Sequence, residues 1–149
     1  TFMALGSLAA NLTAMGFGSI TANIKRKKLE NKINSGTVEK EDLIWLSSYY
    51  HEKKDYLKAE SFAKKLYEIM PEDSSPYYLL FNINFSKKDY KSAIPFLEHL
   101  LESGTDEPEN YHNIGYCYWL LGENEKSDEY RLKAESINPK LKQYAYKKI

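Results

Sequence analysis

The sequence predicts an all-α solenoid built from helix-turn-helix repeats. Tyr56, Tyr90 and Asn124 are spaced 34 residues apart; each follows an acidic residue and precedes a small residue by three positions. A fixed period of this length with helical patterning marks a helix-turn-helix repeat. Pro71 and Pro139 each follow a predicted second helix, where proline stops helix propagation. Three repeat units are therefore expected.

Each unit is expected to contain two amphipathic helices joined by a short polar turn. Leu43, Leu46 and Tyr50 recur at i, i+3 and i+7, which predicts the first helix of unit one. Lys53-Lys54-Asp55 then forms the turn, and a second apolar stripe follows it. The same arrangement predicts helices near 76–87, 90–103, 108–121 and 124–137.

Local signals predict where several of these helices begin and end. Ser75 and Pro76 fit an N-cap and a first helical residue, and Thr37 fits the cap of the first repeat helix. Gly104 fits a left-handed residue just past a helix. Pro95 is expected to kink its helix or to delay its start, because proline lacks the backbone N–H.

The chain divides into a repeat array and two flanking segments. The predicted units cover 40–73, 74–107 and 108–141, preceded by an apolar N-terminal helix at 1–24 and a basic linker or helix at 25–39, and followed by a C-terminal capping helix at 142–149. A stacked array requires such a cap over its last apolar face.

The three units resemble the tetratricopeptide repeat, whose pattern is W-x2-L-G-x2-Y, then A-x3-F, then P. The residues that carry the resemblance are Leu43, Leu46, Ser47, Tyr50, Ala59, Ala63 and Pro71 in unit one; Tyr77, Leu80, Phe81, Asn84, Ala93 and Leu97 in unit two; and Tyr111, Ile114, Gly115, Tyr118, Ser127, Arg131 and Pro139 in unit three. The resemblance implies a superhelix whose first helices line a concave, protein-binding groove. The bulky Phe81 stands where unit three has Gly115, so unit two must pack differently.

Carrying the family's groove positions onto this chain gives a largely apolar and aromatic surface. The candidate partner-binding residues are Ile44, Trp45, Ser48, Tyr78, Leu79, Asn82, Phe85, His112, Asn113, Tyr116 and Trp119. Such a surface suits an apolar helix or an extended segment, and the two asparagines suit its backbone. The cationic clamp by which the family's heat-shock co-chaperones hold a C-terminal carboxylate is absent, because its places hold Ile44, Ser48, Leu79, Glu109 and Asn113.

The composition argues against enzymatic, metal-binding and nucleic-acid-binding functions. The formal net charge is zero, whereas a general nucleic-acid binder carries a basic face. Cys117 is the single cysteine, and the three histidines fall in different units without metal-ligand spacing. We therefore expect a non-enzymatic interaction protein without a cofactor or metal.

The N-terminal segment favours a membrane anchor. Residues 2–24 carry no charge, and the basic residues Lys25, Arg26, Lys27 and Lys28 follow at once. This pattern fits a spanning helix with the repeats on the cytoplasmic side. Small residues that suit helix packing in membranes recur every fourth position: Gly6, Ala10, Ala14, Gly18 and Ala22. The polar residues within the segment leave two alternatives open, a helix that docks on the repeats and a processing remnant.

Three functional hypotheses follow. The first is a membrane-tethered scaffold subunit or assembly factor of a membrane complex, which binds an apolar or helical segment of a protein partner in its groove. The second is a soluble chaperone similar to the class II chaperones of type III secretion, which have three such repeats. The third is a homo-oligomeric scaffold in which residues 2–24 of one copy fill the groove of the next.

Overall fold

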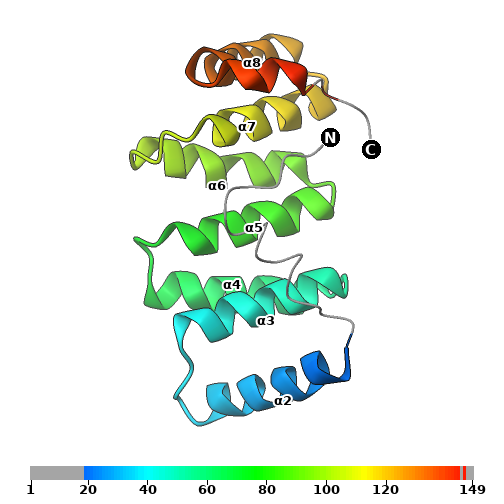
Figure 1. Cartoon of the computed structure of the whole chain (residues 1–149), viewed down its shortest axis with the longest axis vertical. Helices are drawn as coiled ribbons and strands as arrows, with labels where there is room; N and C mark the ends of the chain where they lie inside the picture. The colour runs from blue at the N-terminus through cyan, green and yellow to red at the C-terminus, as the bar shows by residue number, and fades with distance from the viewer. Residues whose placement is uncertain (1–18, 145, 147–149) are drawn as a thin grey trace.

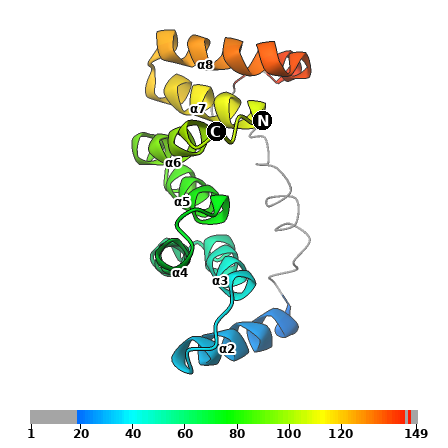
Figure 2. The ribbon, with the colours of Figure 1, turned by 90° about the vertical axis from the view of Figure 1, so that its left-hand side faces the viewer.

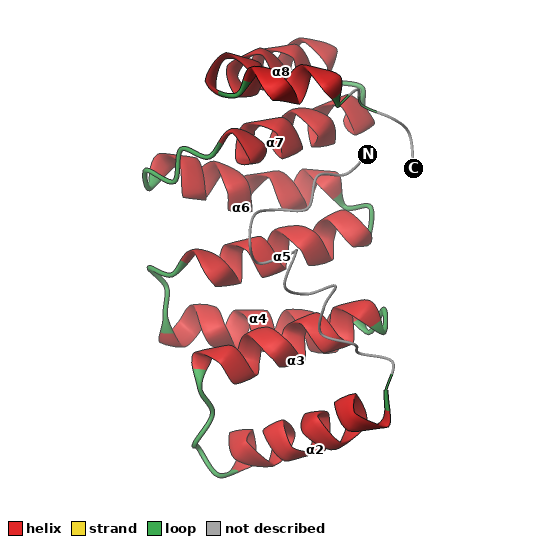
Figure 3. Cartoon of the chain, in the orientation of Figure 1, coloured by secondary structure: helices red, strands yellow, loops and turns green. Residues whose placement is uncertain are grey.

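The computed structural model describes residues 19–144 and 146 and confirms the all-α class. Helices and loops make up this part of the chain, which contains no strand (Figure 3). Its helices are α2 (Ile20–Asn34), α3 (Lys40–Glu52), α4 (Tyr56–Ile69), α5 (Ser74–Ser86), α6 (Tyr90–Glu102), α7 (Pro108–Leu121), α8 (Asn124–Ile137) and the 3-10 helix η1 (Pro139–Gln143).

The helices stack in chain order into a curved array (Figure 1). The pairs α3–α4, α5–α6 and α7–α8 form the three predicted units, and α4 and α6 also pack against the first helix of the unit that follows them. Viewed from the side, α3, α5 and α7 lie along the inner, concave side of the stack (Figure 2). Two buried clusters, one around α3 and α4 and one around α5 to α8, meet at Phe96.

Small residues hold the two helices of each unit close together, as the pattern predicted. Ala59 and Ala93 are fully buried, and the Ser47 hydroxyl donates to the Ala59 carbonyl at 2.9 Å. A Cβ on Gly115 would lie only 3.1 Å from the Ser127 carbonyl oxygen of α8. In unit two the same position holds Phe81, which is also fully buried.

The turn inside each unit repeats with the same period. Lys54, Lys88 and Gly122 all have positive φ, at 59°, 62° and 79°. The next residue is the N-cap of the second helix, and the Asp55 and Asp89 carboxylates accept from the backbone N–H three residues later. Two of the three units thus place a lysine in a left-handed conformation that favours glycine.

Several helix boundaries differ from the predicted ones. Asp73, not Ser75, caps α5, because its carboxylate accepts from the Ser75 N–H at 2.8 Å. Glu39, not Thr37, caps α3 through a capping box with Asp42. Pro95 lies inside α6 without delaying its start. The left-handed Gly104 after α6, with φ of 91°, is confirmed.

Helix α2 packs on unit one as α6 packs on unit three. The Tyr50 hydroxyl donates to Glu30, and 68 residues later the Tyr118 hydroxyl donates to Glu98. Tyr50 also stacks on Phe62 with its ring centroid 5.6 Å away, as Tyr118 does on Tyr130. A lysine covers each tyrosine ring, Lys58 at 4.8 Å and Lys126 at 4.9 Å. Since 68 is two periods, α2 stands where the second helix of a preceding repeat belongs.

The expected division between 1–24 and 25–39 falls inside α2. Ser19 caps this helix, which runs without interruption through the basic residues. Of the row of small residues, Ala22 is buried in the cluster with Leu46, and the other four lie outside the described residues. Within residues 19–144, no helix combines the length and the hydropathy needed to cross a bilayer.

The described part of the C-terminal segment caps α7 and α8 without an α-helix. It begins as the 3-10 helix η1, whose Leu141 is buried. Tyr144 and Tyr146 are not helical, and the remaining residues of the expected capping helix lie outside the described part. Tyr146 packs on α7 through its ring contacts with His112 and Tyr116.

Candidate protein-binding surface

The predicted groove residues all lie on α3, α5 and α7, the helices of the concave side. They differ in accessibility. Ile44, Tyr78, Asn82 and Trp119 are half-buried, and Trp45, Ser48, Leu79, Phe85, His112, Asn113 and Tyr116 are buried. The set therefore combines a buried floor with a few accessible side chains.

At the N-terminal end of this face, aromatic residues of α3 contact α2. Trp45 and Tyr49 stack with their ring centroids 5.2 Å apart. The Tyr49 hydroxyl donates to Asn23 Oδ1 at 2.6 Å, and Lys25 Nζ lies 4.7 Å from the centroid of the Trp45 ring. Trp45 thus contributes to the attachment of α2 as well as to the predicted groove.

At the C-terminal end, aromatic rings from three segments pack together. Phe85 of α5 lies 5.9 Å from Tyr116 of α7, and Tyr116 stacks on Trp119 at the same centroid distance. Tyr146 stacks on Tyr116 at 5.2 Å and donates its hydroxyl to the His112 carbonyl at 3.2 Å. The sequence interpretation missed Tyr146 as a site residue, although it lies 34 residues after His112, at the same repeat position.

Three polar side chains of α7 are buried with atoms that lack a hydrogen-bond partner among the described residues. Both amide atoms of Asn113 lack one, as do Asn110 Oδ1 and His112 Nδ1. Asn113 and Asn110 are fully buried, and His112 is 2% exposed. Buried polar groups are nearly always satisfied in folded proteins, so the local cluster on α7 requires an explanation.

Burial controls the titration of the nearby groups. It lowers the pKa of His112 from 6.5 to about 4, and it also lowers the pKa of His51. The His51 ring pairs with the Ser86 hydroxyl across units, with Nε2 2.7 Å from Oγ. Burial raises the pKa of the Cys117 thiol to about 12, opposite to the lowered pKa of a nucleophilic cysteine.

No cluster of three metal-ligating side chains occurs within residues 19–144.

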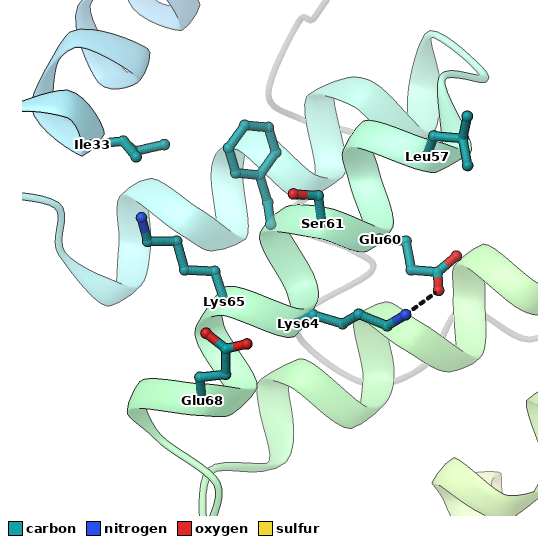
Figure 4. A pocket seen from close by; sticks show the side chains of 8 residues that line it. Ile33, Leu57, Glu60, Ser61, Lys64, Lys65 and Glu68 are labelled. Atoms are coloured by element: carbon teal, nitrogen blue, oxygen red, sulfur yellow. Dashed lines mark ion pairs between the residues drawn. The ribbon is translucent and has the colours of Figure 1, made fainter.

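Two hollows lie beside α2. One lies between α2 and α4, where Ile33 faces the side chains of α4 and Glu60 pairs with Lys64 at 2.7 Å (Figure 4). Glu60 also pairs with Lys87 at 3.5 Å, which joins units one and two. The second hollow is more basic and is lined by Thr21, Ile24, Lys25, Lys28, Leu29, Lys32 and Asp42.

The stacked helix pairs and their concave face define a class, the α-solenoid binding scaffold. A sequence profile of the Tetratricopeptide repeat matches residues 108–141, which is the predicted third unit. Residues 108–141 are therefore a tetratricopeptide repeat, and proteins with such repeats are typically non-enzymatic scaffolds for protein–protein interactions.

Curated relatives share the repeats over part of the chain. The chain is 29% identical over 87 residues to Superkiller complex protein 3 of Homo sapiens, covering 58% of this chain and 6% of the relative. It is 30% identical over 99 residues to Protein CTR9 homolog of Arabidopsis thaliana, covering 64% of this chain and 9% of the relative. The chain therefore spans less than a tenth of the length of these relatives.

Proposed function

We propose that the concave face of units two and three binds an apolar, extended or helical segment of a partner protein. The observation that carries this proposal is Asn113, which is fully buried with both amide atoms unpartnered among the described residues. A carboxamide offers one acceptor and two donor hydrogens. Once a bound segment displaces the side chains that cover Asn113, its amide can pair with both the N–H and the C=O of a peptide group in that segment.

The surroundings of Asn113 support an apolar ligand. Tyr116 and Trp119 stack on the same helix, and the half-buried Tyr78 of α5 accepts from Asn110 at 3.2 Å. Aromatic side chains of this kind supply contact area at a low entropic cost and are enriched at protein interfaces. Ile44, Ser48 and Leu79 stand where the family's carboxylate clamp belongs, so recognition through the interior of a segment is favoured over its C-terminus.

The Asn113→Leu variant tests this proposal before the partner is identified. Leucine has a similar volume and leaves no unpaired polar atom, so we expect the free energy of unfolding to rise by about 1–3 kcal/mol. Binding of the partner should weaken roughly tenfold or more, the equivalent of one lost hydrogen bond to a buried group. Urea titration measures the first effect, and calorimetry with the purified partner segment measures the second.

Asn84 provides the matched control. It is also buried, but its Nδ2 donates to the Leu80 carbonyl at 2.8 Å. The Asn84→Leu variant should therefore have a lower or an unchanged free energy of unfolding, without the increase expected for Asn113→Leu. A loss of stability in Asn113→Leu would show that this amide is already satisfied in the free protein, and the proposal would then be abandoned.

We further propose that the segment before α2 tethers the repeats to a membrane, with the repeats on the cytoplasmic side. The uncharged run and the basic residues after it support this proposal. Ala22 is buried on unit one and Asn23 accepts from Tyr49, and both belong to α2, which begins at Ile20; the spanning stretch is therefore placed before α2, within residues 2–19. These eighteen residues would reach about 27 Å as a helix, close to the bilayer core of about 30 Å.

Charges placed within that stretch test the tether. The intact chain should stay in the membrane pellet after alkaline carbonate extraction, whereas Leu8→Lys/Leu12→Lys should move to the supernatant, because charged residues at membrane depth are costly. Full extraction of the unaltered chain would contradict a spanning anchor. The soluble-chaperone and homo-oligomer hypotheses would then be tested instead, the latter by light scattering at several concentrations.

A further inference from the structure

We propose that the exposed face of α2 lies on an anionic membrane surface. Ile20 and Ile24 are 80% and 62% exposed, one helical turn apart. Lys27 and Lys28 follow at i+3 and i+4 from Ile24, so one lysine flanks each side of the isoleucine stripe. Both lysines are exposed. Apolar side chains bordered by lysines are typical of helices that lie in the membrane interface.

The charge of α2 is available to a partner only at part of its surface. Arg26 pairs with Glu30 at 2.6 Å, and Lys32 pairs with Asp42 at 2.8 Å. Lys25 lies over the Trp45 ring. Lys27 and Lys28 form no ion pair within residues 19–144. The unpaired positive charge of the helix is therefore concentrated beside the exposed isoleucines.

The repeat register shows that the adjacent side of α2 is also unusual. In unit one the second helix faces its own first helix through Ala59, Phe62 and Leu66, of which Ala59 and Leu66 are fully buried. One period earlier, the corresponding residues of α2 are Lys25, Lys28 and Lys32. These lysines line the basic hollow described above. Of the three, Lys28 has no ion pair within residues 19–144, and its exposed ammonium group suits an anionic surface.

Two observations favour a lipid surface over an acidic protein. The exposed isoleucines would gain from partial insertion between headgroups, because removing apolar surface from water is favourable. The uncharged run of residues 2–24 continues into the first turn of α2, so the proposed tether would deliver this helix to the bilayer. Each basic residue at an anionic membrane surface contributes about 1 kcal/mol. The inference rests on the proposed tether and adds a requirement for anionic headgroups.

A fluorescent label on α2 tests the inference in the full chain. Asn31 is exposed and lies on the same face as Ile24 and Lys27. The single natural thiol, Cys117, is fully buried, so an environment-sensitive dye will label Asn31→Cys selectively. Its emission should shift to the blue with vesicles containing roughly 30 mol% phosphatidylserine and should stay unchanged with phosphatidylcholine vesicles. A label at Glu125→Cys on α8 should not respond to either vesicle.

Charge reversal then identifies the responsible residues. In Lys27→Glu/Lys28→Glu, the lipid concentration for half-maximal response should rise at least about tenfold. Lys140→Glu/Lys142→Glu makes the same change in net charge at the opposite end of the array and should shift it less than about twofold. A response to anionic vesicles that survives Lys27→Glu/Lys28→Glu would overturn the assignment to α2.

Different experimental results would contradict the proposed tether and the proposed contact of α2 with anionic headgroups. If the labelled chain floats with neutral and anionic vesicles alike and the dye responds equally to both, the tether stands and the anionic surface is overturned. If the dye responds to anionic vesicles alone while carbonate extracts the unaltered chain, α2 binds headgroups and the spanning anchor is wrong. No response to anionic vesicles overturns the α2 inference.

Discussion

Replacing Phe81 with alanine is expected to lower the free energy of unfolding by about 3–5 kcal/mol. Phe81 is fully buried and lies in the cluster formed by α5 to α8. It occupies the repeat position that holds Ser47 in unit one and Gly115 in unit three. Units one and three close this space by direct helix contact, whereas unit two fills it with the phenyl ring. Truncation would therefore leave a cavity in the centre of the array.

Urea unfolding at neutral pH measures this effect, with Phe81→Leu as the control. Leucine retains most of the apolar volume, so that variant should lose only about 1–1.5 kcal/mol. A loss below about 1 kcal/mol in Phe81→Ala would mean that α5 and α6 close the gap as the helices of unit three do. In that case the phenyl ring would be a passive replacement and not a support of the central unit.

Acidification is expected to remove about 2 kcal/mol of stability through His112 alone between pH 7.5 and pH 5. Burial lowers the pKa of His112 to about 4 from 6.5. The unfolded chain therefore takes up a proton as the pH falls through about 6.5, while the folded chain stays neutral at this ring. Stability should decline from pH 6.5 down to about pH 4, below which both states are protonated and the loss levels off.

Comparison with His112→Gln separates this histidine from other titrating groups. Glutamine does not titrate, so the variant should lose about 2 kcal/mol less than the unaltered chain over the same interval. His51 also has a lowered pKa, and the acid sensitivity that remains in the variant will include its contribution. Equal pH dependence in the two proteins would show that the His112 ring reaches solvent in the folded state.

The repeat period predicted most of the fold because it reports on packing. Ala59 and Ala93 are small where two backbones meet, and this requirement recurs in each unit whatever the surrounding residues. The first residues of the helices were less predictable, because several neighbouring residues can each serve as the N-cap. Thr37 and Ser75 are acceptable caps by residue type, yet Glu39 and Asp73 cap the helices because their carboxylates reach backbone N–H groups two or three residues later.

The role of α2 could not be predicted from the same signals. Lys25 occupies the position of Ala59, so the helix breaks the pattern at its most diagnostic residue. Only weaker signals in the sequence place α2 in the repeat register. Glu30 lies two periods before Glu98, and Gly36 lies two periods before Gly104. Burial on the concave side was also unpredictable, because helix position gives the direction of a side chain without the neighbours that cover it. Tyr146 covers His112 from a segment that lacks helical structure at that point.

The lysines that line the basic hollow of α2 also bear on self-association. A solenoid with an open terminal face is at risk of end-to-end polymerisation, since each copy offers a surface on which another repeat can stack. Lys25, Lys28 and Lys32 make α2 a poor template for such stacking, because a second copy would have to desolvate the ammonium group of Lys28 and displace the contacts of Lys25 with Trp45 and of Lys32 with Asp42. The residues of α2 that depart furthest from the repeat pattern are therefore expected to disfavour stacking of a second copy on this side.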